Sequence, residues 1–456
     1  MPIPHIRLDK KSATPLYRQV SSAIQNLISQ GKLAPDTKLP SVRQLAQALD
    51  INTTTVVSAY KQLEQEMSVY SVVGSGTFVA RQVVASATLE SHVSADNIEG
   101  YINFADTTTD AALFPVTAFR RAFDAVLDRD GGLAFECHDN RGFAPLRESL
   151  CRLLDGCTVE PNCIQIVPDS QQGIEIIANE LLSPGDTVFV EGFTSQGGIE
   201  AFLSRRAQIV EMPLTKDGPD FVALDALLKK HRPKLIHVMP NFQTPTGATY
   251  SEESKAKLIQ LAQSAGAYIL EEDQLSDFYY DGVKRTSLKA IDSSSRVIYI
   301  KSFSKIISQG LGIGFIALPK DIGTPKLAPP IVSGYIQRGF DLFLRSGAYD
   351  LHMANMRSVY GRRYQKMEAA AKAYLGHLGD FKLPGGGLSL WIKPFGVIGD
   401  YIEGFLQRKV VVSPGRIFSA GGGDADGFRI SFASVPEERI AEGVGIIAAV
   451  LEERKP

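Results

Sequence analysis

Hydrophobic residues recur at helical spacing in three segments near the N-terminus. Val20 and Ile24 lie four residues apart within residues 14–29, which predicts a first helix there. A second apolar stripe follows Ser41, which has a glutamine three residues later and so forms the sequence pattern of a capping box. A third stripe follows Asn52, a residue that commonly caps helix N-termini. Three short helices are therefore expected.

Two short apolar runs come next, at residues 69–73 and 77–79, and they flank Gly74-Ser75-Gly76. Glycine tolerates the backbone angles of tight turns, so this segment predicts a β-hairpin. Three helices followed by a hairpin form a winged helix-turn-helix, whose last helix fits the major groove of DNA. Residues 1–80 are therefore expected to form a DNA-binding domain.

From residue 101 onward, short apolar runs alternate with helical patterns such as residues 252–265. The expected strands are 187–190, 207–210, 235–238, 268–270 and 297–300. This alternation predicts an α/β body with a largely parallel sheet covered on both faces. Residues 345–456 predict a smaller α+β lobe, and the polar residues 81–100 a linker. The expected fold is multidomain, with the body spanning 101–456.

Composition and charge exclude several classes of function. The 456 residues are 44% hydrophobic and have a net charge of −2, so the whole chain is not a polyanion binder. Residues 1–80 contain eight Lys or Arg and five Asp or Glu, a local balance of +3 that suits DNA. The four cysteines form no C-x-x-C pair, which argues against a metal site. We also see no secretory signal and no membrane-spanning run, and expect a cytoplasmic protein.

The N-terminal motifs resemble the GntR-family DNA-binding domain. The segments that carry the resemblance are Pro15–Gln19, Lys38–Ala46, Thr55–Tyr60 and Gly74–Val79. The resemblance implies that the partner is a double-stranded DNA operator. The residues expected to contact it are Arg43, Ser41, Thr53, Thr54, Thr55, Ser58, Lys61, Gly74, Ser75 and Gly76.

Two positions depart from the GntR pattern. Thr53 and Val72 stand where family members usually carry arginine. Hydroxyl groups can still bond to bases or phosphates, and Arg43 and Lys61 can neutralise phosphates. Two alternatives therefore stay open: a head that reads DNA weakly or differently, and a winged helix that serves only in dimerisation.

A lysine motif, Ser302-Phe303-Ser304-Lys305, directly follows the apolar run 297–300. Together with 183–188, Pro245-Thr246-Gly247 and 428–432, it resembles fold-type I aminotransferases, which bind pyridoxal phosphate (PLP). A GntR-type head joined to such a body is similar to the MocR subfamily of transcription regulators. The resemblance implies a homodimer.

The resemblance also implies roles for individual residues around the PLP ring. Lys305 matches the lysine that forms the Schiff base. Glu272 stands where an aspartate keeps the pyridine nitrogen protonated, and Thr244 where an asparagine bonds to the ring hydroxyl. Ser195 stands in place of a stacking tyrosine, and Gln274 in place of a second tyrosine.

The phosphate cup departs furthest from the family pattern. Ser170 and Ser302 are neutral donors at the expected positions, but Asp169 places a carboxylate at the start of a predicted helix. Gly312 stands where an arginine would clamp the phosphate. The cup thus loses a cation and gains an anion. We therefore expect that PLP is not the physiological cofactor, with PLP binding through Lys305 as the alternative.

Three states of Lys305 stay open: an ion pair with Glu272 or Asp273, an aldimine, or a solvated amine. Arg429 matches the arginine that binds a substrate carboxylate in aminotransferases, which implies a small carboxylate effector. A purely structural arginine is the alternative. The basic run 362–366 predicts a solvated helix face.

These observations predict a DNA-binding transcription regulator. Its aminotransferase-like body would form a homodimer and sense a small carboxylate effector without catalysis. The alternatives are a regulator that binds PLP as a Lys305 aldimine and an active PLP-dependent aminotransferase. The colour of a PLP aldimine distinguishes them.

Overall fold

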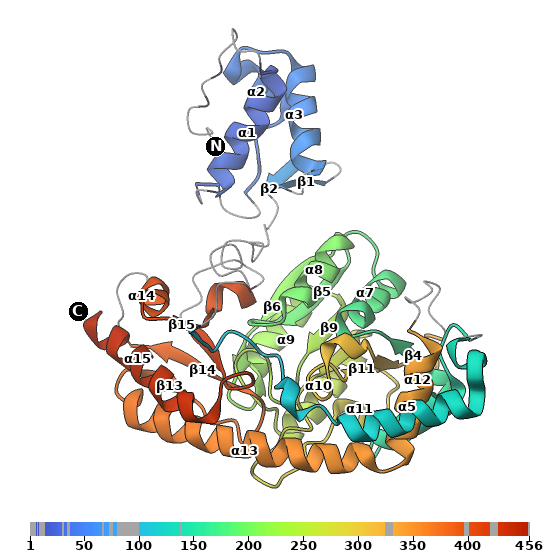
Figure 1. Cartoon of the computed structure of the whole chain (residues 1–456). Helices are drawn as coiled ribbons and strands as arrows, with labels where there is room; N and C mark the ends of the chain where they lie inside the picture. The colour runs from blue at the N-terminus through green and yellow to red at the C-terminus, as the bar shows by residue number, and fades with distance from the viewer. Residues whose placement is uncertain are drawn as a thin grey trace. The chain divides into compact units, whose positions relative to one another are not determined.

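The computed structural model describes two compact units, one within the first 92 residues and a larger body that holds most of the remaining chain. The described residues are 6, 8, 14–29, 32–33, 37–65, 68–72, 76–79, 100–136, 139–323, 332–395, 401–419 and 427–454. The first unit, the head, is blue in Figure 1, and the body runs from cyan to red.

The head is a winged helix-turn-helix. Its elements are α1 (Leu16–Ser29), α2 (Val42–Leu49), α3 (Thr53–Gln65), β1 (Val69–Val72) and β2 (Gly76–Val79). The capping box is confirmed, because the Ser41 hydroxyl accepts from the Gln44 amide while the Gln44 side chain accepts from the Ser41 amide. Asn52 accepts from the amide of Thr54 and caps α3 as predicted. The strands β1 and β2 pair antiparallel.

The body is built on a mixed sheet. Within the described residues this sheet has seven strands, in the order β4-β12-β11-β10-β9-β5-β6. Their bounds are β4 (Ile164–Val167), β12 (Gly314–Ala317), β11 (Val297–Ser302), β10 (Tyr268–Asp273), β9 (Pro233–Val238), β5 (Thr187–Glu191) and β6 (Gln208–Met212). All neighbours are parallel except β12, which is antiparallel to β4 and β11. The expected largely parallel sheet is therefore confirmed.

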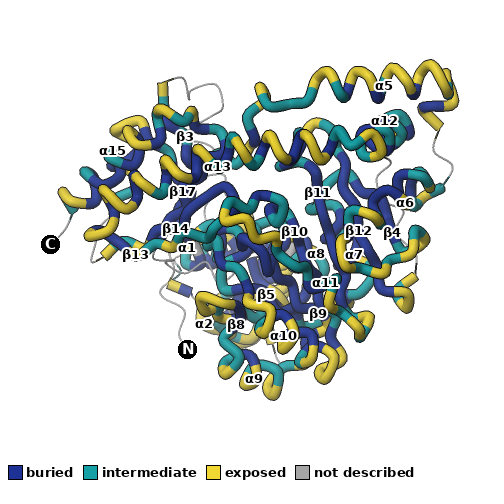
Figure 2. Tube along the Cα trace, turned by 90° about the horizontal axis from the view of Figure 1, so that it is seen from below, coloured by how far each residue is buried: buried dark blue, intermediate teal, exposed yellow. Residues whose placement is uncertain are grey.

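Helices cover both faces of this sheet, and the strands are buried between them (Figure 2). The helices of the body are α5 (Val116–Asp130), α6 (Ala144–Leu153), α7 (Ser170–Leu181), α8 (Gln196–Ser204), α9 (Phe221–Lys230), α10 (Glu252–Ala265), α11 (Leu288–Ile291), α12 (Gly334–Arg345), α13 (Ala348–Tyr374), α14 (Tyr401–Gln407) and α15 (Ile440–Glu453). Leu224, Leu258 and Leu288 from α9, α10 and α11 share one apolar cluster with the strands. Gly173 of α7 and Gly198 of α8 lie against the opposite face.

A smaller lobe completes the body. Its sheet has the order β13-β14-β17-β16, formed by β13 (Gly379–Phe381), β14 (Ser389–Pro394), β17 (Phe428–Ser431) and β16 (Ser413–Pro414). Two small pairs add β3 (Ile102–Asn103) with β15 (Val410–Val411), and β7 (Leu214–Thr215) with β8 (Gly218–Pro219). The parallel pairing of β3 with β15 brings the start of the body to the small lobe. No helix among the described residues is both long and apolar enough to cross a membrane.

Candidate functional site

Lys305 follows the end of β11 and is half-buried. Its Nζ donates to the backbone oxygen of Thr107 at 3.1 Å and to the Thr107 hydroxyl at 2.5 Å. Burial and the neighbouring Arg429 guanidinium lower the pKa of Lys305 to about 8, while Asp106 opposes them. The ion pair with Glu272 or Asp273, one of three states left open by the sequence, is wrong, because both carboxylates have other partners.

Glu272 lies on β10, where both of its carboxylate oxygens are bound by other side chains. One oxygen is 3.1 Å from Nε2 of His237 and accepts from Ser195 at 3.4 Å; the other accepts from Gln274 at 2.5 Å. Burial would raise the pKa of Glu272, but the contacts with His237, Gln274 and Ser170 hold it below its usual value. Both oxygens at the position expected to face a pyridine nitrogen thus have partners within the protein.

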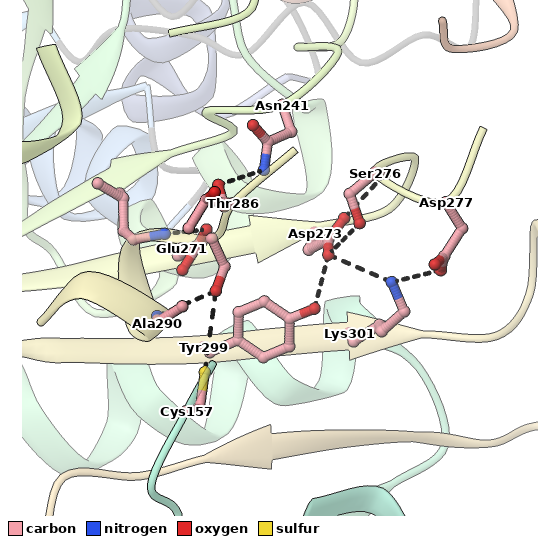
Figure 3. A network of polar contacts seen from close by, with 12 residues as sticks. Cys157, Asn241, Glu271, Asp273, Ser276, Asp277, Thr286, Ala290, Tyr299 and Lys301 are labelled. Atoms are coloured by element: carbon pink, nitrogen blue, oxygen red, sulfur yellow. Dashed lines mark hydrogen bonds and ion pairs between the residues drawn. The ribbon is translucent and has the colours of Figure 1, made fainter. Parts of the chain in front are cut away.

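Asp273 belongs to a separate buried network (Figure 3). Its Oδ2 lies 3.2 Å from Nζ of Lys301 and accepts from the Tyr299 hydroxyl at 2.6 Å. Asp277 contacts the same Nζ at 2.8 Å. Burial opposes the charge of Lys301, but the two carboxylates raise its pKa above the ordinary value. Lys301, four residues before the motif lysine, is therefore the lysine that carboxylates hold.

The phosphate cup carries the features expected from the sequence. Asp169 is the N-cap of α7 and accepts from the Gln172 amide at 2.8 Å. Ser170 is the first residue of that helix, and the hydroxyls of Ser302 and Ser304 lie 2.8 Å apart. A carboxylate and neutral hydroxyls at a helix N-terminus do not fit a phosphate dianion.

The remaining positions of the cofactor pattern do not supply the missing contacts to PLP. Gly312 has a left-handed φ of 59°, and a Cβ built there meets no atom within 4 Å. Ser195 supplies a hydroxyl where a ring would stack on the cofactor. Thr244 is half-buried before Pro245. The residues present therefore do not fit PLP, although the fold would place its aldehyde near Lys305.

Arg429 lies on β17 and is 8% exposed. Its Nη2 donates to the backbone oxygen of Ala105 at 3.0 Å and to the Ser413 hydroxyl at 2.9 Å, and its guanidinium lies 5.0 Å from the ring centre of Phe418. Its Nε is buried without a hydrogen-bond partner in the described part of the chain. Burial lowers its pKa to about 10, which Asp106 partly offsets. Arg429 is thus a buried cation bound to neutral oxygens.

One basic residue of α13 contradicts the expected solvated face. Arg363 is buried, lies 2.6 Å from a carboxylate oxygen of Asp110 and donates to the backbone oxygen of Ala433. Arg362 and Lys366 are exposed, as predicted. The helical pattern did not predict the burial of Arg363, because its partner Asp110 is distant in the sequence. The spacing of residues within one helix carries no information on such contacts.

In the head, the predicted DNA-contacting residues lie on two elements. Thr53, Thr54 and Ser58 are exposed on α3, and Lys61 follows Ser58 on the same face, since residues three and four apart are neighbours on a helix. The remaining predicted contacts are half-buried Thr55 on α3, exposed Ser41 and Arg43 at the start of α2, and exposed Gly76 on β2. Gly74 and Ser75 lie outside the described residues.

Sequence reasoning missed His237, Lys301 and Thr107. His237 alternates with apolar residues in β9 and bonds to Glu272 from the adjacent strand. Lys301 interrupts an apolar strand, and this is the signal that could have identified it. Thr107 has no local signal, because its contact with Lys305 joins residues far apart in the chain.

Comparison with known proteins identifies both units. Bacterial regulatory proteins of the gntR family match residues 16–79, and the aminotransferase class I and II family matches residues 105–447. The HTH-type transcriptional regulator YisV of Bacillus subtilis is 26% identical over 457 residues, which cover 93% of each chain. The 2-aminoadipate transaminase of Thermus thermophilus is 27% identical and covers 81% of this chain and 94% of its own.

The fold of the body is shared with solved aminotransferases. The multiple substrate aminotransferase of Thermococcus profundus has a TM-score of 0.75 and 26% identity, covering 82% of this chain and 96% of its own. The family is PLP-dependent, whereas the cup of this chain has the substitutions described above. The chain belongs to the aminotransferase class I and II family and carries a head of the gntR family of bacterial regulatory proteins, the architecture of MocR-like regulators.

Proposed function

We propose that the protein is a DNA-binding transcription regulator whose body binds a small carboxylate effector, without catalysis. The observation that carries the effector is Arg429, a buried cation with an unpartnered Nε beside the second cation, Lys305. Because a buried charge is stabilised most strongly by an opposite charge, a carboxylate is the ligand chemistry that this pair favours.

The head supplies the DNA-binding part of the proposal. The face of α3 that carries Thr54, Ser58 and Lys61 is exposed, and Arg43 is exposed on α2. These residues provide hydroxyl donors and positive charges, which suit base edges and phosphates. A homodimer on a two-part DNA site is the expected assembly, since such heads commonly bind paired half-sites.

The absence of PLP from the working protein is part of the same proposal. Asp169 occupies the helix N-terminus that a phosphate would use, and Gly312 supplies no cation. Both carboxylate oxygens of Glu272 already have partners in His237 and Gln274, so a pyridine nitrogen would have to share them. Catalysis by transamination needs the cofactor as electron sink, so we propose that the body senses rather than reacts.

The effector is tested by thermal denaturation of the full chain against a panel of amino acids and 2-keto acids. Binding raises the melting temperature by mass action, and Arg429→Ala should abolish the shift. Arg416→Ala, an exposed arginine nearby in sequence, is the matched control and should keep it. Ligands whose shifts survive Arg429→Ala as well as Arg416→Ala would contradict the proposed site.

A second candidate is a regulator that binds PLP through Lys305. The lowered pKa of this lysine, about 8, favours it, because an aldimine forms from a neutral amine. Incubation with excess PLP followed by desalting separates the candidates. A visible band that persists in the wild type and is missing in Lys305→Ala would establish this alternative.

A further inference from the structure

One short segment of chain, Ala105–Thr109, here called the strap, supplies oxygens to both cations, Lys305 and Arg429. The Ser413 hydroxyl also accepts from Arg429. The backbone oxygen of Ala105 accepts from Arg429 at 3.0 Å. The backbone and side-chain oxygens of Thr107 accept from Lys305 at 3.1 and 2.5 Å. The strap therefore occupies Nη2 of Arg429 and Nζ of Lys305, two donors that a ligand carboxylate would use.

Both ends of the strap are fixed to the body. On one side, β3 pairs with β15, and the Phe104 amide donates to the backbone oxygen of Val411 at 2.8 Å. On the other side, the Asp110 carboxylate lies 2.6 Å from Arg363, and the Asp110 amide donates to the Tyr360 hydroxyl at 3.0 Å. These anchors hold the strap near the site whether or not its middle contacts the cations.

The backbone amides of Ala105 and Asp106 donate to the side-chain oxygen of Asn103 at 3.0 and 3.3 Å, so the start of the strap is tied to β3. Further along, Thr107 is held by Lys305. The Thr108 amide donates to Asp106 at 2.7 Å, a contact internal to the strap, and Thr108 is exposed. Lys305 and Arg429 repel one another, and the strap offers them neutral oxygens together with the field of Asp106. A carboxylate binds to a cation more strongly than a neutral carbonyl does.

We propose that the strap is a built-in competitor, which a ligand carboxylate displaces from Lys305 and Arg429. This inference rests on the proposed effector site and adds how that site is regulated: the strength of the strap contacts sets the affinity for the ligand. The strap lies directly after β3, at the end of the body that is nearest in sequence to the head.

The test uses the full chain, with pyruvate as the carboxylate probe and sodium cyanoborohydride as the reductant. The ketone of pyruvate condenses with the neutral amine of Lys305 and releases water, and hydride from the reagent then reduces the new C=N bond to a stable secondary amine. Peptide mass spectrometry reports the labelling of Lys305 relative to that of Lys284, whose side chain is 57% exposed.

Thr107→Val removes one acceptor of Lys305 and keeps the branched side chain. We expect it to accelerate labelling of Lys305 by about tenfold, the factor typical of losing a hydrogen bond to a charged donor. Thr108→Val is the matched control, because the exposed Thr108 side chain has no described contact with either cation, and it should label like the wild type. Hydrogen exchange at the amides of Asp106 and Thr108 should be faster in the labelled protein.

Equal labelling rates in Thr107→Val and Thr108→Val would overturn the strap, as would unchanged or slower exchange at these amides after labelling. Failure of pyruvate to label Lys305 in every variant would also overturn it. The proposed effector site has a separate test, the Arg429-dependent thermal shift. If that shift is observed together with any of these results, the proposal that the strap competes with the ligand is wrong and the proposed effector site is retained.

Discussion

Two lysines four residues apart have opposite electrostatic environments. Lys301 lies between Asp273 and Asp277, with Tyr299 and Ser276 completing the hydrogen bonds of Asp273. Lys305 contacts only neutral oxygens of Thr107 among the described residues. The charge of Lys301 is neutralised by two carboxylates within the fold, whereas Lys305 has no carboxylate partner among the described residues.

The largest expected effect is on stability. Lys301→Met leaves Asp273 buried without its cation, and breaking a buried ion pair from one side costs about 3–5 kcal/mol of unfolding free energy. Lys305→Met removes a half-buried charge that has no carboxylate partner among the described residues, so it should leave stability unchanged or raise it at neutral pH. Chemical denaturation of both variants measures the difference, and equal losses would break the comparison.

The head extends the contrast to charges that face solvent. Arg43→Ala with Lys61→Ala should weaken binding to a DNA operator by about tenfold per residue and reduce the slope of log affinity against log salt by about one per lost phosphate contact. Lys216→Ala with Lys229→Ala, two exposed lysines of the body, is the control and should leave both unchanged. A salt titration of DNA binding provides the measurement. Retention of specific DNA capture after deletion of residues 1–80 would exclude the head as the DNA-binding unit.

The pH dependence of stability should also separate the two lysines. The folded pKa of Lys305, about 8, lies below the ordinary lysine value of 10.5. The unfolded chain therefore binds more protons between these values, and the stability due to Lys305 rises with pH across this window. The raised pKa of Lys301 predicts no gain over the same window.

Melting curves at pH 7, 8.5 and 10 therefore compare the wild type with Lys305→Met. The advantage of the methionine variant should shrink as the pH rises, because the wild-type amine loses its proton. The difference between wild type and Lys301→Met should not narrow in this way. A parallel response of the two variants would show that the environments of the two lysines are alike.

The smallest expected change in stability concerns the cofactor cup. Asp169→Gly costs only a few tenths of a kcal/mol, because glycine is an acceptable N-cap. Combined with Gly312→Arg it removes an anion and restores a cation, so the double variant should bind PLP more tightly than the wild type. Absorbance after desalting measures the bound cofactor, and Gly312→Lys with Asp169→Gly tests whether charge alone is enough. Equal retention of PLP by the wild type and the double variant would show that Asp169 and Gly312 do not determine PLP binding.

Local features of the fold could be predicted from the sequence. The capping box of Ser41 and Gln44 and the cap at Asn52 depend on residues within one helical turn, and the apolar runs of the sheet report burial directly. The role of Asp169 as a helix cap was predicted for the same reason. These interactions form between residues close in the chain, where spacing carries the information.

The partners of the buried charges could not be predicted in this way. Lys305 contacts Thr107, Arg429 contacts Ala105, and Arg363 contacts Asp110. The two residues of each pair are far apart in the sequence. The spacing of residues in the sequence does not indicate which of several nearby carboxylates a lysine contacts. Of Lys301 and Lys305, only the side chain of Lys301 points to Asp273 and forms the ion pair. Such pairings follow from the assembled sheet and the small lobe together.

The left-handed conformation of Gly312 has a consequence for reversibility. The space around its Cβ is open, so no neighbour prevents an arginine there. The backbone nevertheless disfavours any side chain with a Cβ by about 1–2 kcal/mol, and asparagine is the residue that tolerates this geometry best. Asparagine should therefore be tolerated at this position with a smaller loss of stability than arginine. A phosphate-binding cup that regains its arginine at this position therefore carries this backbone cost in addition to the two exchanged side chains.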